Sequence, residues 1–322
     1  MERTFPPVNP KLPRFLHGAD YNPEQWSPEV WQEDMRLMKL ANVNVATVGV
    51  FSWVSLQPEP DRFEFDWLDT IMDSLTQNGI HAVLATPSAA HPAWLSHQHP
   101  EVLRTDASGR RRRHGNRVNF CPNSTAYREA CAAIARRLAE RYKDHPALLL
   151  WHVSNEYSGL CYCEKCAGAF RKWLKEKYGS LDELNERYWT PFWSHTYTDW
   201  LQVEPPWEHG EQSIPALKVD YARFGNESLL ECYLNEARVL REVAPEVPVT
   251  TNMMAMCYTT DYRRWAPHVD VVSWDCYPSV RGDTAWTAFS HDLMYGLKDG
   301  GRPFLLMEQT PSSQNWQAVN AL

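Results

Sequence analysis

The sequence predicts an α/β fold, specifically a (β/α)8 TIM barrel, from three observations. Short apolar segments alternate with amphipathic helical segments along the chain, the pattern of βα units around a parallel sheet. The 322 residues are enough for one large barrel. Helix-start signals precede helical segments, as where Ser27 is followed by Pro28.

Seven strands are expected, separated by long helices. The expected strands are 15–21, 43–50, 81–86, 147–154, 247–254, 269–274 and 303–308. The expected helices include 28–40, 67–77, 124–142 and 217–243. A region rich in Trp, Tyr and Pro, 159–215, is expected to be a loop insertion after the fourth strand.

The barrel is expected to be incomplete. Only 14 residues follow Glu308, which leaves no room for an eighth strand and its helix. We therefore expect residues 1–322 to form one catalytic barrel domain in which seven strands are present and the eighth is missing.

Composition excludes several classes of protein. The longest apolar run, around residues 147–151, is far shorter than the roughly 18 residues of a membrane span. The first 15 residues contain four prolines and no apolar core of a signal peptide, so a cytoplasmic location is expected. The net charge of −8 argues against nucleic acid as a partner, although Arg110–Arg113 form one basic run.

Two glutamates end apolar strands. Glu156 follows the run at 148–155, and Glu308 follows 304–307. Catalytic groups of (β/α) barrels lie at the carboxyl ends of the strands. Strands four and seven face each other across the barrel mouth, which permits the pair of carboxyl groups that glycoside hydrolysis requires. The alternative is that each glutamate caps the N-terminus of the next helix, where a negative charge is favourable. This explanation is weaker for two strand-end glutamates than for one.

Several motifs together resemble glycoside hydrolase family 42, the β-galactosidases of bacteria and archaea. They are spread over 15–316, nearly the whole chain. The motifs lie at 17–26, 49–53, 115–121, 154–157, 161–166, 273–278 and 307–309.

The resemblance implies an activity and a set of site residues. It implies hydrolysis of terminal non-reducing β-D-galactose from β-galactosides with retention of configuration. Glu156 is then the general acid/base and Glu308 the nucleophile, while Arg117, Asn155 and Trp316 contact the galactose. Relatives form homotrimers through a trimerisation domain that is followed by a small β domain, and both domains are absent from these 322 residues.

Four of the eight cysteines suggest a metal site. Cys161, Cys163 and Cys166 form a C-x-C-x2-C pattern, and Cys121 comes from the preceding βα loop. Four thiolates suit a closed, structural Zn²⁺ site, and the same cysteines match a metal site of some family 42 members. The alternative is a set of reduced cysteines in a packed loop.

Two other functions remain open from the sequence. The missing barrel closure leaves room for a non-catalytic carbohydrate-binding fragment that keeps Arg117, Asn155 and Trp316. A catalytic zinc centre at the cysteines is disfavoured, because four thiolates leave no coordination position for water.

Overall fold

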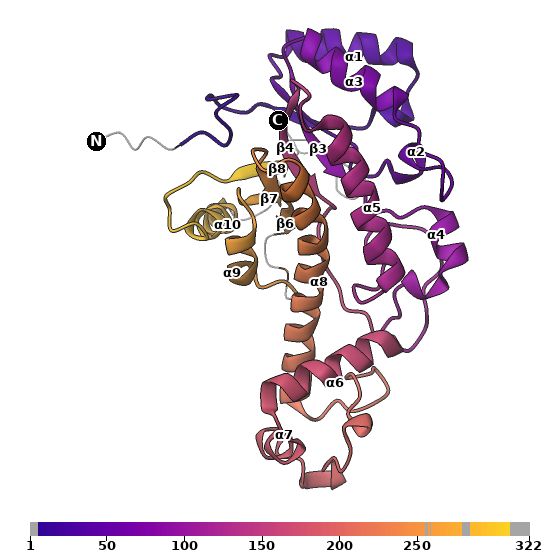
Figure 1. The fold of residues 1–322 in the computed structure, drawn as a ribbon. Coiled ribbons are helices and arrows are strands. Elements are labelled where there is room, and N and C mark those ends of the chain that lie inside the picture. Colours follow the sequence, from indigo (N-terminus) through magenta and orange to yellow (C-terminus); the bar gives the residue numbers. More distant parts are fainter. Residues whose placement is uncertain (1–5, 255–256, 258, 279–283, 310–322) are drawn as a thin grey trace.

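A computed structural model describes residues 6–254, 257, 259–278 and 284–309, and its elements alternate as expected (Figure 1). The strands are β1 (Gly18–Tyr21), β2 (Val45–Val48), β3 (His81–Thr86), β4 (Leu148–Val153), β5 (Val249–Thr250), β6 (Asn252–Met254), β7 (Ser273–Cys276) and β8 (Leu305–Gln309). The α-helices are α1 (Pro28–Leu40), α2 (Trp53–Leu56), α3 (Asp66–Gln77), α4 (Ala93–Gln98), α5 (Thr125–Tyr142), α6 (Glu164–Tyr178), α7 (Leu181–Tyr188), α8 (Pro215–Val243), α9 (Tyr262–Trp265) and α10 (Thr284–Gly296). Short 3-10 helices are η1 (Pro23–Gln25), η2 (Pro100–Val102), η3 (Phe192–Ser194), η4 (Trp200–Gln202) and η5 (Ala266–His268).

The parallel strands follow chain order around the barrel. One sheet has the order β1-β2-β3-β4-β5 and a second has β6-β7-β8. The strand expected at 247–254 is one barrel strand interrupted at Thr251. At the interruption, Thr250 Oγ1 donates to Val271 O at 2.6 Å, and Ser273 Oγ donates to Thr251 O at 2.9 Å. Side chains thus replace backbone pairing there, and the described residues supply seven barrel strands, as predicted.

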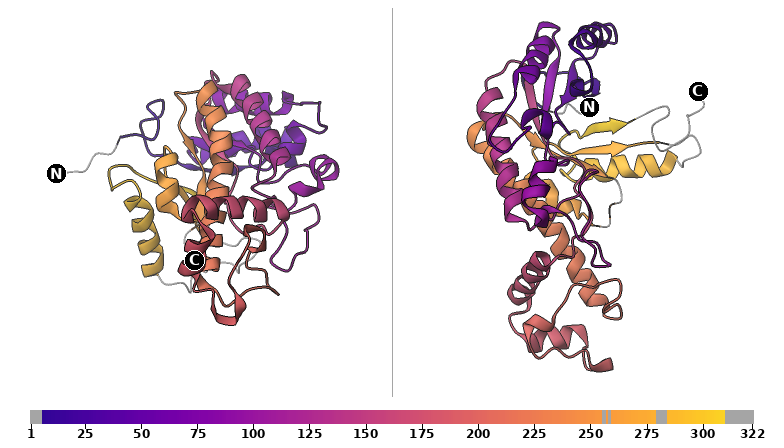
Figure 2. Two further views of the ribbon diagram at one scale, coloured as in Figure 1. Left: turned by 60° about the horizontal axis from the view of Figure 1, so that its bottom comes forward. Right: turned by 90° about the vertical axis from the view of Figure 1, so that its right-hand side faces the viewer.

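Helices α3, α5 and α8 lie on the outside of the barrel (Figures 1 and 2) and pack on it through buried apolar residues. In α3 the buried positions Leu68, Ile71, Met72 and Leu75 recur every three or four residues, which is one face of a helix. Helices α5 and α8 pack against each other as well as on the strands. Within the described residues, none of these helices combines the length and the apolar character needed to cross a bilayer.

The N-terminal segment closes the bottom of the barrel. Leu12 packs with Val45, Val83 and Leu149 from the strands. Asn9 Nδ2 donates to the carbonyl of Leu149 at 2.7 Å. Because this end is plugged, the open end lies at the carboxyl ends of the strands.

The barrel is open between β1 and β8. Among the described strands, none pairs with the outer edge of either one. Three of the four residues of β1 are exposed, whereas all four of β2 are buried. The first strand is also shorter than expected, since Phe15 is 85% exposed and lies outside it. The prediction of a barrel lacking its eighth strand is confirmed for the described residues.

The insertion at 159–215 forms a small helical unit with a core of its own. It contains α6, α7, η3 and η4. The 29-residue α8 runs from this unit to the barrel and packs against both (Figure 1). The core of the unit includes Phe170, Leu174, Leu184, Tyr188, Leu217, Tyr221 and Phe224.

Candidate active site

Glu156 stands in an unusual turn just after β4. Ser154 and Glu156 both adopt left-handed conformations, with φ of 57° and 46°. Such a conformation costs a non-glycine residue on the order of 1–2 kcal/mol, so neighbouring contacts must hold it. Ser154 N–H donates to the Thr86 hydroxyl at 3.0 Å, and Glu156 N–H donates to Asn252 Oδ1 at 2.8 Å. The turn is thereby tied to the end of β3 and to the start of β6.

Three carboxyl groups meet at this end of the barrel. Carboxylate oxygens of Glu156, Asp275 and Glu308, one from each residue, all lie within 4.8 Å of one another. Asp275 and Glu308 are register partners on β7 and β8, which places their side chains side by side. The two glutamates predicted from the strand ends are thus brought together, with a third acid beside them.

Arg117 contacts the first of these acids. Its Nη2 lies 2.6 Å from Glu156 Oε2, and its guanidinium lies over the Phe51 ring at 6.0 Å. The neighbouring residues Asn116 and Val118 have φ of 59° and 53°, and Val118 N–H donates to Ala89 O at 2.7 Å. A constrained loop therefore presents the guanidinium to the mouth of the barrel, and the Arg117 side chain is 40% exposed.

Asn155 links Arg117 to Glu308. With its amide oriented to satisfy both neighbours, its oxygen accepts from Arg117 Nη1 at 2.6 Å and its nitrogen donates to Glu308 Oε1 at 3.2 Å. Asn155 is 2% exposed. Trp316, the remaining predicted sugar contact, lies outside the described residues.

Sequence reasoning missed three further members of the site. Asn252 Nδ2 donates to Asp275 Oδ2 at 2.7 Å and to Glu308 Oε1 at 3.1 Å. The Tyr277 hydroxyl donates to Glu308 Oε2. Two features of the sequence could have indicated these residues. Asn252 is a polar residue inside the expected strand 247–254, and Asp275 and Tyr277 directly follow the expected strand 269–274.

The surroundings shift the pKa values of Asp275 and Glu308. Burial raises the pKa of Asp275 well above its usual range, and the charges of Glu308 and Glu156 add to this effect. Burial also raises the pKa of Glu308, but hydrogen bonds from Tyr277 and Asn252 oppose that rise. Burial and the neighbouring charges therefore favour the uncharged form of Asp275, while donated hydrogen bonds favour the carboxylate of Glu308.

The four predicted cysteine ligands also meet. The sulfur atoms of Cys121, Cys161, Cys163 and Cys166 all lie within 4.8 Å of one another. Cys121 Sγ is 3.4 Å from Cys163 Sγ and 3.5 Å from Cys166 Sγ. Tetrahedral zinc with bonds of about 2.3 Å separates its sulfur ligands by roughly 3.8 Å, so the donor set fits. This cluster joins the insertion to the loop before α5 and is separate from the carboxylates.

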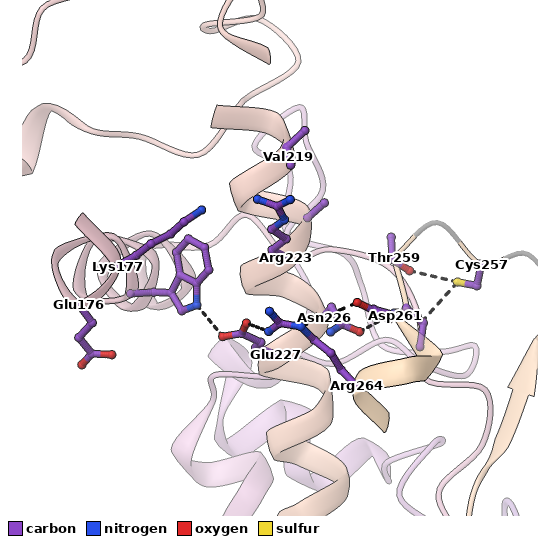
Figure 3. A pocket seen from close by; sticks show the side chains of 13 residues that line it. Glu176, Lys177, Val219, Arg223, Asn226, Glu227, Cys257, Thr259, Asp261 and Arg264 are labelled. Carbon is purple, nitrogen blue, oxygen red and sulfur yellow. Dashed lines mark hydrogen bonds and ion pairs between the residues drawn. The ribbon is translucent and has the colours of Figure 1, made fainter. Parts of the chain in front are cut away.

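A cavity of about 880 Å³ lies beside α6, α8 and the loop after β6 (Figure 3). The charged side chains in its wall are largely paired. Glu227 forms an ion pair with Arg264 and also accepts a hydrogen bond from Trp173 Nε1 at 2.6 Å. In its wall, the Thr259 hydroxyl accepts from Gly159 N–H at 3.2 Å. The cavity therefore borders the loop that follows Glu156 but does not contain the three acids.

Known proteins are similar to this chain in both sequence and fold. The family model Glyco_hydro_42, described as beta-galactosidase, matches residues 20–322. The beta-galactosidase BgaP of Planococcus sp. (strain L4) is 51% identical over 322 residues, which cover 98% of this chain and 48% of that protein. The beta-galactosidase BglY of Alicyclobacillus acidocaldarius is 50% identical, covering 98% of this chain and 46% of that protein.

A solved structure repeats this likeness in three dimensions. The cold-adapted beta-galactosidase of Rahnella sp. R3 superposes with a TM-score of 0.96 at 45% identity, covering 99% of this chain and 48% of its own. This chain thus spans about half the length of the relatives it matches. On the family match and on these likenesses, the chain belongs to glycoside hydrolase family 42, the β-galactosidases.

Proposed function

We propose that this chain carries the catalytic machinery of a retaining glycoside hydrolase that removes terminal non-reducing β-D-galactose from β-galactosides. The observation that carries the proposal is the separation of at most 4.8 Å between oxygens of Glu156 and Glu308. Retaining enzymes hold their two carboxyl groups roughly 5–5.5 Å apart, whereas inverting enzymes need about 6.5–9.5 Å to admit a water molecule. The spacing supports double displacement.

In the first step, Glu308 attacks the anomeric carbon while Glu156 gives its proton to the departing oxygen. The glycosidic C–O bond breaks and an ester bond to Glu308 forms. In the second step, Glu156 takes a proton from water, whose oxygen attacks the same carbon and releases Glu308 as a carboxylate. Both residues end as they began.

The neighbours of the two glutamates suit these roles. Asn252, Asn155 and Tyr277 donate to Glu308, so they orient it and favour its ionised, nucleophilic form. Arg117 and Asn155 present donors to the mouth of the barrel, where the hydroxyl groups of a galactose are held in this proposal. Trp316 is proposed as the stacking face for the sugar ring.

The relatives are about twice as long as this chain, so the whole protein has further parts in our proposal. The remainder completes the barrel, and the assembly is a homotrimer, as implied for the family. A second candidate follows from the open edges of β1 and β8: these residues alone bind a galactoside without turning it over. Turnover of a chromogenic galactoside by the 322-residue chain, measured beside its melting temperature with galactose, separates the two.

We also propose that Cys121, Cys161, Cys163 and Cys166 hold a structural Zn²⁺. The converging sulfur atoms support this, as do two donors that face them: Thr105 N–H lies 3.4 Å from Cys161 Sγ, and Asn123 Nδ2 lies 3.3 Å from Cys166 Sγ. Zinc would contribute a cross-link between the insertion and the barrel and would take no part in hydrolysis, because four thiolates leave no open position.

The test of the hydrolase proposal replaces the nucleophile. In Glu308→Gly, galactoside hydrolysis is expected to fall to background, and added azide is expected to fill the vacated space and give an α-galactosyl azide. The matched control is Glu246→Gly, in an exposed loop, which should hydrolyse galactosides normally and give no azide product. Unchanged hydrolysis in Glu308→Gly would overturn the assignment. A β-configured azide would overturn it too, because that product forms by attack on a covalent intermediate and so requires an intact nucleophile.

A further inference from the structure

Glu236 is a carboxyl group buried in the core behind the acid/base turn. It is 1% exposed and belongs to α8, about halfway along the part that packs on the barrel. Its position is set by helix periodicity, since Leu229, Cys232, Tyr233 and Leu240 are buried at the same face, three or four residues apart. A glutamate on such a stripe enters the core with its helix. The reaction described above makes no use of it.

The carboxyl group joins two loops at the carboxyl ends of the strands. Ser88 Oγ, from the loop after β3, donates to Glu236 Oε1 at 2.7 Å. The Tyr157 hydroxyl donates to the same oxygen at 3.3 Å. Tyr157 directly follows Glu156, so the Glu236 side chain connects α8 to the acid/base turn. Glu236 Oε2 is buried and has no hydrogen-bond partner within the described residues.

Tyr157 is well placed to transmit that contact. It is 4% exposed, its ring lies 5.4 Å from the Trp265 ring, and its carbonyl accepts from the Thr260 hydroxyl at 3.3 Å. Its side chain thus points into the core, while the neighbouring Glu156 reaches Arg117 on the other side of the backbone. The left-handed backbone of Glu156 needs such contacts, because it is unfavourable by itself.

We propose that Glu236 is a positioning residue for the general acid: by holding Ser88 and Tyr157 together, it keeps Glu156 at the angle from which it protonates the leaving group. The inference rests on the proposed hydrolase function and deepens it. It predicts that α8, which contributes no group to the reaction itself, controls the acid step and leaves the attack by Glu308 largely unaffected.

The surroundings of Glu236 favour its uncharged form. Burial raises its pKa to about 7, and the hydroxyl groups of Thr86, Ser88 and Tyr157 only partly oppose that rise. The titratable groups that face it are Tyr127 and Cys131 of α5, Cys232 of α8 and Tyr157, all of which are uncharged at neutral pH. A neutral amide of the same shape should therefore replace it.

The test compares three variants of the full-length protein that carries this chain. Glu236→Gln keeps the shape and the acceptor oxygen, Glu236→Leu removes them, and Tyr157→Phe removes only the hydroxyl. Each is assayed on two aryl β-galactosides, one whose leaving group departs without protonation (2,4-dinitrophenol) and one that needs the acid (phenol). Glu231→Gln, on the exposed side of the same helix, is the control.

We expect Glu236→Leu to lose on the order of 10- to 100-fold in kcat/KM on the phenyl substrate, because a small displacement of a catalytic group costs that much. The comparison uses kcat/KM because this parameter reports the first step, before Glu156 acts as a base on water. The loss of this variant on the dinitrophenyl substrate should be under about threefold. Tyr157→Phe should show the same split to a smaller degree, while Glu236→Gln and the control should resemble the wild type. Equal losses on both substrates, or no loss in Glu236→Leu, would overturn the inference.

A crystal structure of Glu236→Leu provides a readout that does not depend on activity. The inference expects residues 154–157 to move and Glu156 to separate from Arg117, and an unmoved turn refutes it. If the wild type hydrolyses neither galactoside, the proposed function fails. The crystal structure of Glu236→Leu still decides in that case whether Glu236 positions the turn.

Discussion

Asn252 offers the sharpest test of how the site works. Its side-chain nitrogen has two hydrogens, and it donates to Asp275 Oδ2 at 2.7 Å and Glu308 Oε1 at 3.1 Å. Its oxygen accepts from Glu156 N–H at 2.8 Å. Asn252→Asp keeps the size and this acceptor, but it removes both donors and places a fourth acid in the cluster.

The loss can be estimated from those two bonds. A hydrogen bond to a charged acceptor such as the Glu308 carboxylate contributes about 1.5–3 kcal/mol. One to a neutral acceptor, the form that burial favours for Asp275, contributes about 0.5–1.5 kcal/mol. Their sum is about 2 kcal/mol at the low end, which corresponds to roughly a 30-fold lower kcat/KM. Repulsion from the added acid acts in the same direction, so the expected loss for Asn252→Asp is at least about 30-fold.

The assay is kcat/KM for an aryl galactoside, measured together with the unfolding midpoint so that an unfolded variant is recognised. Asn42→Asp makes the same chemical change in an exposed turn and should leave kcat/KM within about threefold of the wild type. A folded Asn252→Asp variant with activity in that same range would show that the amide does not act on the carboxylates, and the electrostatic account of the site would be wrong.

Three more predictions follow from the same structure. Tyr277→Phe removes a hydrogen bond that lowers the pKa of Glu308, so the acidic limb of the kcat/KM profile should shift to higher pH; a shift to lower pH would contradict this. The raised pKa of Glu236, from 4.5 to about 7, means that its stabilising contribution is present below pH 4.5 and is lost as pH rises through about 7. Between pH 4.5 and pH 7, the free energy of unfolding of the wild type should therefore fall by up to about 3 kcal/mol more than that of Glu236→Gln, as measured by chemical denaturation. Parallel curves of unfolding free energy against pH would refute the linkage. Chelation, or Cys163→Ser, should release zinc and lower the melting temperature while Cys257→Ser does neither; a wild type that contains no zinc would rule the metal site out.

Local patterns in the sequence determined much of this molecule. An apolar strand that ends in a polar residue can be recognised within ten residues, and for this reason the strand order and the positions of Glu156 and Glu308 could be predicted. The close spacing of Cys161, Cys163 and Cys166 is equally local. These features depend on neighbours along the chain, where the 2.0 and 3.6 residue periods of strands and helices act.

Only the tertiary structure decided which other groups act on those glutamates. Asn252 is 96 residues from Glu156 and 56 from Glu308, yet it bonds to both. Glu236 looks in the sequence like any other helical glutamate, and only the packing of α8 on the barrel places it behind Tyr157. Hydrogen bonding and desolvation act over a few ångströms in space, whatever the separation along the chain, so the ionisation of the site depends on contacts that exist only once the barrel has formed.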